Sequence, residues 1–74
     1  MIRIIDMGYK IIIKFDGQPE IVKIMRSFQA RYFGRDKSWS MSKEKLDDLK
    51  EELTYAGHKY VEINGDEYKL IRAE

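Results

Sequence analysis

Two short stretches near the start of the chain are rich in isoleucine and other strand-forming residues, which predicts a β-hairpin. They cover residues 2–5 (IRII) and 9–15 (YKIIIKF), with Met7-Gly8 as the expected turn, because Gly adopts positive φ without strain. This turn would place four isoleucines on one side of the hairpin, with Ile2 opposite Ile13 and Ile4 opposite Ile11. The other side would carry Arg3, Ile5, Lys10, Ile12 and Lys14.

Two later segments have apolar residues at helical spacing and residues that suit helix ends. Pro19 is favourable in a first helical turn, and the spacing predicts a helix over residues 19–29. A second helix is predicted over residues 43–56. Ser42 is its expected N-cap and Gly57 its expected left-handed C-terminal residue.

Residues 30–41 (ARYFGRDKSWSM) lie between these helices and predict a second hairpin with a loop over 34–37. In this register Tyr32 lies opposite Trp39, on the same side as Met41, which would pack on the second helix. We therefore expect Tyr32 and Trp39 in the core rather than as base-stacking platforms. The residues that point the other way would be Arg31, Phe33 and Ser40.

A third hairpin is predicted at the end of the chain, where Asn64-Gly65 separates strands over residues 60–63 and 66–71. One side would carry Val61, Ile63, Tyr68 and Leu70. The other would carry Tyr60, Glu62, Glu67, Lys69 and Ile71.

The predicted order ββαββαββ favours an α+β fold. The simplest arrangement is a two-layer sandwich in which one antiparallel sheet packs both helices on a single face. A chain of 74 residues is sufficient for a single domain, residues 1–74, with a modest core. The second face of the sheet would then be open to solvent or to a ligand.

The composition argues against several classes of site. The chain has no Cys and one His, His58, so we expect no thiolate chemistry, no metal and no cofactor. No apolar run approaches the ~20 residues of a membrane span, and no signal-peptide pattern opens the chain, so a cytoplasmic protein without membrane contact is expected. The sequence has no glycine-rich phosphate loop and no nucleophile, histidine and acid in the sequence setting of a known catalytic triad, which favours a binding module rather than an enzyme.

Positive and negative charges are separated along the chain, although its net charge is only +1. Residues 1–45 carry ten Lys or Arg against five Asp or Glu, and residues 46–74 carry four against eight. The basic excess is concentrated over residues 23–45. Such a sector favours contact with phosphate groups, and the alternative is an ordinary solvated surface.

Residues 30–41 also resemble part of the HARP-type domain found beside the motor of annealing helicases. These domains have a strand ending near an aromatic–Asp pair, an apolar helix, a hairpin with Arg-Tyr and Trp-Ser, and a second amphipathic helix. The matching segments here are IIIKFD, PEIVKIMRSF, Arg31-Tyr32 with Trp39-Ser40, and KLDDLKEEL. The resemblance covers about residues 10–57 and keeps the Tyr-to-Trp spacing of seven. Phe33 and Asp36 depart from the pattern, where an acid and a threonine are usual.

This resemblance, shared with small DNA-recognition domains of archaeal repair helicases, implies binding of single-stranded or branched DNA beside a helicase or a repair or replication complex. Cations would neutralise phosphates, and an exposed aromatic ring would stack on an unpaired base. The second hairpin would contribute Arg31, Phe33, Arg35 and Lys37. The open sheet face would add Arg3, Lys10 and Lys14, and the first helix would add Lys23 and Arg26. A DNA-binding protein of this kind would be associated with the nucleoid.

The alternative is a protein-interaction or regulatory module without nucleic-acid contact. The apolar side chains predicted on the open face are more numerous than scattered exposure would give. They would form a homodimer or partner interface, and the alternative is that further strands or a different register cover them. These residues are Ile5, Ile12, Phe33, Tyr60 and Ile71. The second helix also carries an acidic run, which is expected to be its solvated side or a surface for a basic partner. The run consists of Asp47, Asp48, Glu51 and Glu52.

Overall fold

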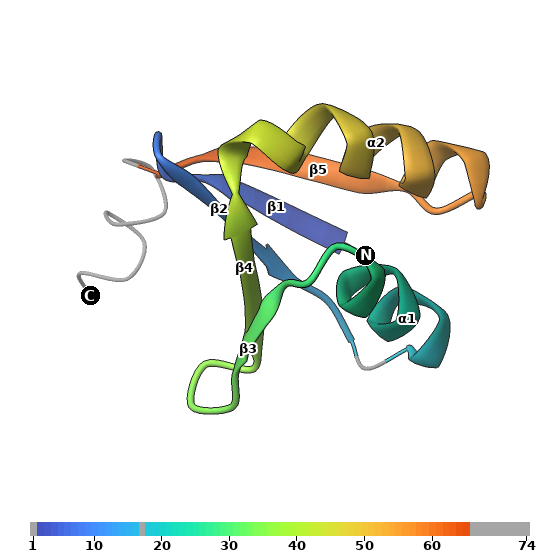
Figure 1. Cartoon of the computed structure of the whole chain (residues 1–74), viewed down its shortest axis with the longest axis horizontal. Helices are drawn as coiled ribbons and strands as arrows, with labels where there is room; N and C mark the ends of the chain where they lie inside the picture. The colour runs from blue at the N-terminus through green and yellow to red at the C-terminus, as the bar shows by residue number, and fades with distance from the viewer. Residues whose placement is uncertain (1, 17, 66–74) are drawn as a thin grey trace.

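Strands and helices follow one another in the predicted order in the computed structural model, which describes residues 2–16 and 18–65 (Figure 1). The strands are β1 (Ile2–Asp6), β2 (Lys10–Lys14), β3 (Arg31–Phe33), β4 (Ser38–Ser42) and β5 (Tyr60–Asn64). The helices are α1 (Pro19–Ser27) and α2 (Leu46–Tyr55), and a 3₁₀ turn over Lys43–Lys45 precedes α2. The α+β class is confirmed, and the strand predicted over residues 66–71 lies outside the described residues.

β1 and β2 form the predicted hairpin, but its turn lies one residue later than predicted. The Met7 N–H donates to the Lys10 carbonyl at 2.9 Å, so the central residues of the turn begin at Gly8 instead of Met7. Gly8 has a φ of +94°, and its N–H donates to the Asp6 carboxylate at 2.8 Å, which stabilises the turn. Each residue of β1 therefore pairs two positions further along β2 than predicted. A shift of two keeps every side chain on its predicted side.

The register predicted for the β3–β4 hairpin is confirmed. Tyr32 pairs with Trp39, and their ring centroids lie 4.9 Å apart at an interplanar angle of 50°, a favourable geometry for two aromatic rings. Trp39 is half-buried against the core, as predicted. The prediction of a core position for Tyr32 is wrong, because this residue is 53% exposed. It belongs to an edge strand, which has only one neighbouring strand.

Local hydrogen bonds define both ends of the second helical segment. The Ser42 hydroxyl accepts a hydrogen bond from the Glu44 N–H at 3.3 Å, which confirms the predicted N-cap. At the other end Gly57 has a φ of +82°, and the His58 N–H donates to the Leu53 carbonyl at 2.9 Å. This is the Schellman arrangement, in which a left-handed glycine ends the helix.

The last described strand corrects the predicted sheet. β5 pairs with β1 in parallel, so the sheet is mixed rather than wholly antiparallel, with the strand order β3-β4-β2-β1-β5. The chain passes from β4 to β5 through α2, and a helical crossover of this kind supports parallel strands. The second strand of the hairpin predicted through Asn64-Gly65 lies outside the described residues.

One apolar layer joins the sheet to both helices, which lie on the same side of it, as predicted (Figure 1). The sheet contributes Ile2, Ile4, Ile11, Ile13 and Met41. The helices contribute Ile21, Met25, Leu49 and Leu53. None of these side chains is more than 6% exposed, and burial of one such side chain contributes about 1.5–3 kcal/mol.

Within residues 2–16 and 18–65, neither helix is long and apolar enough to cross a membrane.

The side assigned to Tyr60 from the sequence is wrong. The parallel register places Tyr60 beside Ile2, so it packs against the core on the helix side of the sheet. Val61 and Ile63 consequently point to the opposite side, where Val61 is 38% exposed.

Two further members of the predicted apolar interface are not exposed on the open side. Ile5 lies there between Ile12 and Ile63, but it is completely buried. Ile71 lies outside the described residues. Of the predicted interface, Ile12 remains half-buried and Phe33 is 45% exposed.

Candidate nucleic-acid interface

Strand β4 places small hydroxyl side chains on the helix-free side of the sheet. Trp39 and Met41 pack against the core, and side chains alternate along a strand, so Ser38, Ser40 and Ser42 point the opposite way. From the first to the last, these three residues span about 13 Å. We call them the serine strip, of which Ser42 also caps the helical segment.

Longer side chains border the serine strip on both sides. Lys10 of β2 and Arg31 of β3 each pair with a residue of the strip, so they share its side of the sheet. Phe33, which pairs with the strip at Ser38, adds an aromatic ring that is 45% exposed. The result is a low row of small side chains between cations and one exposed ring, in which Ser38 is buried, Ser40 half-buried and Ser42 exposed.

Three cations from three different elements line a small pocket at one end of this surface. Arg3 and Lys14 pair across β1 and β2, and Lys37 comes from the loop between β3 and β4. Phe15 and Asp16 complete the lining, and the volume is about 190 Å³. We call this the basic pocket.

Most of the residues predicted to bind nucleic acid lie on this surface or at its edge. The sheet carries Arg3, Lys10, Lys14, Arg31 and Phe33, and the exposed loop after β3 carries Arg35 and Lys37. Lys23 and Arg26 are also exposed, but they belong to α1, which covers the other side of the sheet. They are therefore separate from this surface.

Two other basic residues of segment 23–45 stabilise the fold itself. Lys43 Nζ lies 3.1 Å from the Asp6 carboxylate, and Lys45 Nζ donates to the Phe28 carbonyl at 2.7 Å. A hydrogen bond from the Gly8 N–H and the ammonium of Lys43 hold the pKa of Asp6 below its ordinary value.

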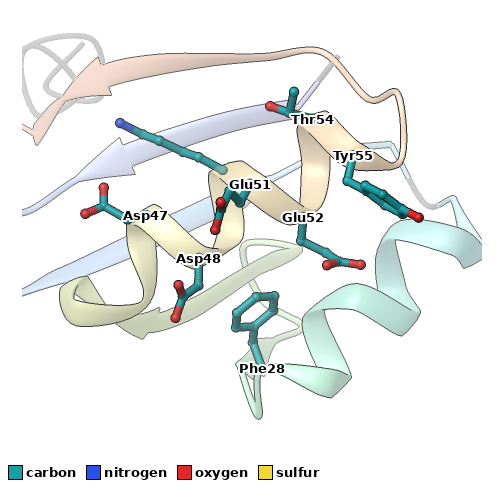
Figure 2. Close-up of a pocket in the computed structure, with 8 residues that line it drawn as sticks. Phe28, Asp47, Asp48, Glu51, Glu52, Thr54 and Tyr55 are labelled. Atoms are coloured by element: carbon teal, nitrogen blue, oxygen red, sulfur yellow. The ribbon is translucent and has the colours of Figure 1, made fainter.

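Negative charge is concentrated on the helix side of the molecule. Figure 2 shows a pocket along α2, with Phe28 facing this helix from the end of α1 and Tyr55 at its C-terminal end. The pocket has a volume of about 760 Å³, and we call it the acidic pocket. Its acidic lining consists of Asp47, Asp48, Glu51 and Glu52. Within the described part of the chain, none of these carboxylates forms an ion pair.

The serine strip and the basic pocket are surface features that the sequence analysis did not predict. The serine strip has a local signal, the S-x-S-x-S spacing of residues 38–42 around the core residues Trp39 and Met41. The basic pocket has no such signal, because strand pairing brings its cations together. Among residues 2–16 and 18–65, no three His, Cys, Asp or Glu side chains are grouped so as to hold a metal ion.

No family model matches the chain, and comparison with curated proteins and with solved structures gives no significant match. The resemblance to HARP-type domains thus rests on the sequence segments quoted above.

Proposed function

We propose that the helix-free side of the sheet binds single-stranded nucleic acid, with single-stranded or branched DNA as its substrate. The observation that carries the proposal is the gathering of basic side chains around an exposed ring on a sheet face that neither helix covers. These residues are Arg3, Lys10, Lys14, Arg31 and Phe33.

Each part of this surface has a defined contribution to binding. The cations neutralise phosphates and release condensed counterions. Stacking of an unpaired base on the ring of Phe33 contributes about 1–3 kcal/mol. The half-buried Ser40 and the exposed Ser42 of the serine strip are small enough to admit the strand, and their hydroxyls donate hydrogen bonds to phosphate or sugar oxygens. None of these contacts reads a base edge, so the binding is largely independent of sequence.

The exposed ring favours unpaired over duplex substrates. In a duplex the bases are already stacked on one another, so Phe33 gains a partner only where a strand is unpaired. A fork offers unpaired strands next to a duplex. Binding to such structures fits an accessory role beside a helicase or a repair or replication complex, in which a second DNA-binding site on the partner raises the overall affinity.

Fluorescence anisotropy with labelled single-stranded, duplex and forked DNA tests the proposal. With four phosphate contacts, raising the salt concentration from ~50 to ~200 mM weakens single-strand binding roughly 50-fold, given a slope of about −0.7 per contact. Tighter binding to duplex than to single strands, or no binding to any DNA, would overturn the proposal.

A pair of matched variants locates the site. Lys10→Gln with Arg31→Gln removes two charges beside the serine strip, whereas Lys23→Gln with Arg26→Gln removes two charges from α1. We expect the first variant to weaken single-strand binding at least tenfold and the second by less than about threefold, since only close phosphate contacts release counterions. Equal losses in both would show that general charge is responsible and that the sheet face is not the site.

A second candidate function, self-association, is favoured by the acidic pocket. Its charge is complementary to that of the β3–β4 hairpin, whose exposed residues include Arg31, Arg35 and Lys37. The hairpin loop and α2 lie at opposite ends of the molecule (Figure 1), so this pairing would join the hairpin to a second copy of the chain.

Sedimentation velocity at low salt tests self-association with two complementary variants. One variant neutralises the pocket (Glu51→Gln with Glu52→Gln), and the other neutralises the hairpin (Arg35→Gln with Lys37→Gln). Each variant alone should be monomeric, while their mixture should form a one-to-one dimer, because each still carries one intact surface. A wild-type protein that stays monomeric would rule out this function.

A further inference from the structure

The basic pocket concentrates more charge than a single backbone phosphate requires. Its lining carries the cations Arg3, Lys14 and Lys37 and the carboxylate of Asp16, a net formal charge of +2. A phosphodiester within a nucleic-acid strand carries one negative charge, whereas a terminal phosphomonoester carries about −1.5 to −2 at pH 7. The pocket therefore matches the charge of a strand end better than that of a strand interior.

The size of the pocket also favours a phosphate group. Its volume of about 190 Å³ has room for roughly six water molecules at ~30 Å³ each. Sites for whole small molecules begin at about 300 Å³. The pocket thus has room for a phosphate with a few waters and is smaller than the sites that enclose whole small molecules.

The position of the pocket connects it to the binding surface. Ile13 and Trp39 pair across the antiparallel strands β2 and β4, so Lys14, which follows Ile13, lies next to Ser38, which precedes Trp39. Phe33 pairs with Ser38 on the other side. The pocket accordingly lies at the Ser38 end of the serine strip. A strand lying along the strip would reach the pocket with its end while the adjacent base stacks on Phe33.

We infer that the basic pocket binds the terminal phosphate of a nucleic-acid strand, an inference that rests on the proposed function of the sheet face. Arg3 supplies a planar guanidinium that binds two phosphate oxygens at once, and the two lysines supply compact positive charges. Asp16 offsets one of these charges and limits the affinity for any anion.

The test compares three single-stranded oligonucleotides of one sequence, with a 5′-phosphate, with a 3′-phosphate or with hydroxyls at both ends. An internal label leaves both ends free for anisotropy measurements. We expect one of the phosphorylated forms to bind about tenfold more tightly than the hydroxyl form, since charge-assisted hydrogen bonds are strong. The phosphorylated form that binds more tightly shows which end of the strand, 5′ or 3′, lies in the pocket.

Two substitutions and a control show whether the pocket causes this preference. Lys37→Gly removes a cation from the pocket and also relieves a left-handed backbone, since Lys37 has a φ of +52°, so a lost preference cannot be attributed to unfolding. Asp16→Asn should increase the preference several-fold by removing the opposing charge. Arg31→Gln lies outside the pocket lining, and it should weaken binding to all three oligonucleotides equally.

The outcomes separate this inference from the proposed function. Equal affinity for the three oligonucleotides overturns the inference and leaves the sheet face as a nucleic-acid site. If no oligonucleotide binds, the proposed function fails. A titration with inorganic phosphate, followed by the amide chemical shifts of the protein, then tests whether the pocket binds an anion at all. Saturable chemical-shift changes at residues 3, 14 and 37 that sodium chloride does not reproduce would support a phosphate site in the pocket. The absence of such changes would contradict it.

Discussion

At the scale of single residues, the side chain of Asp6 stabilises a turn and also pairs with a distant lysine. Its carboxylate accepts the Gly8 N–H at 2.8 Å and lies 3.1 Å from Lys43 Nζ. The first contact stabilises the observed turn of the β1–β2 hairpin. The turn predicted from the strand pattern lies one residue earlier. The second contact ties the observed turn to the residue that follows β4.

Asp6→Asn should lower stability in a pH-dependent way. Asn retains an oxygen that accepts the Gly8 N–H, but it has no charge for Lys43. The pKa of Asp6 is lower in the folded protein than its ordinary value of 3.8, so its ionised form stabilises the fold above pH 3.8, and this contribution is lost as the pH falls through the lowered pKa.

Thermal unfolding at a series of pH values measures this effect. The wild type should melt at a higher temperature than Asp6→Asn at pH 7, and the difference should shrink below pH 3.8. A difference that is the same at every pH would show that the charge of Asp6 contributes nothing to stability.

At the scale of elements, the two helices end in the same way with different residues. The left-handed residue that follows α2 is Gly57, whereas the one that follows α1 is Gln29, which has a φ of +58°. The Ala30 N–H donates to the Met25 carbonyl at 3.0 Å, so this too is a Schellman arrangement. Because Gln has a Cβ, its left-handed conformation is strained. No residue-type signal marks this end, which explains why the predicted helix over 19–29 continues past the observed α1.

Gln29→Gly should raise the free energy of unfolding by about 0.5–1 kcal/mol, because glycine adopts the left-handed conformation without steric cost. Lys23→Gly, an exposed position within α1, is the matched control and should lower it by a similar amount. Urea unfolding of both variants measures the two effects. Destabilisation by both substitutions would contradict the strain assigned to Gln29.

At the scale of the whole molecule, the apolar core and the proposed binding surface lie on opposite sides of one sheet. The helices and the apolar residues of the strands form the core on one side, and the cations and serines line the other. Exposed binding residues can therefore be replaced with little effect on the core. Trp39 is the exception, because it packs against the core while its strand carries the serine strip.

Leu49→Ala should lower the free energy of unfolding by about 2–5 kcal/mol, because Leu49 is completely buried between α2 and the sheet. Glu51→Ala on the exposed side of the same helix should change it by less than about 0.5 kcal/mol. For a chain this short, the first loss is a large fraction of the total. Urea unfolding checks both values, and similar small losses would show that the core is looser than its burial indicates.

The sequence by itself determined the two helical segments, the first four strands and the side of the sheet to which the residues of those four strands point, since these depend on periodicity within a few neighbouring residues. Even the misplaced first turn left the faces of β1 and β2 intact, because side chains repeat every second residue.

Only the tertiary structure decided the parallel pairing of β5, the position of Tyr60 on the core side and the meeting of Arg3, Lys14 and Lys37 in one pocket. The path of the chain through α2 determines which strand β5 joins and in which direction. The pocket depends on residues from β1, β2 and the β3–β4 loop, which are far apart along the chain and become neighbours only when the sheet is assembled.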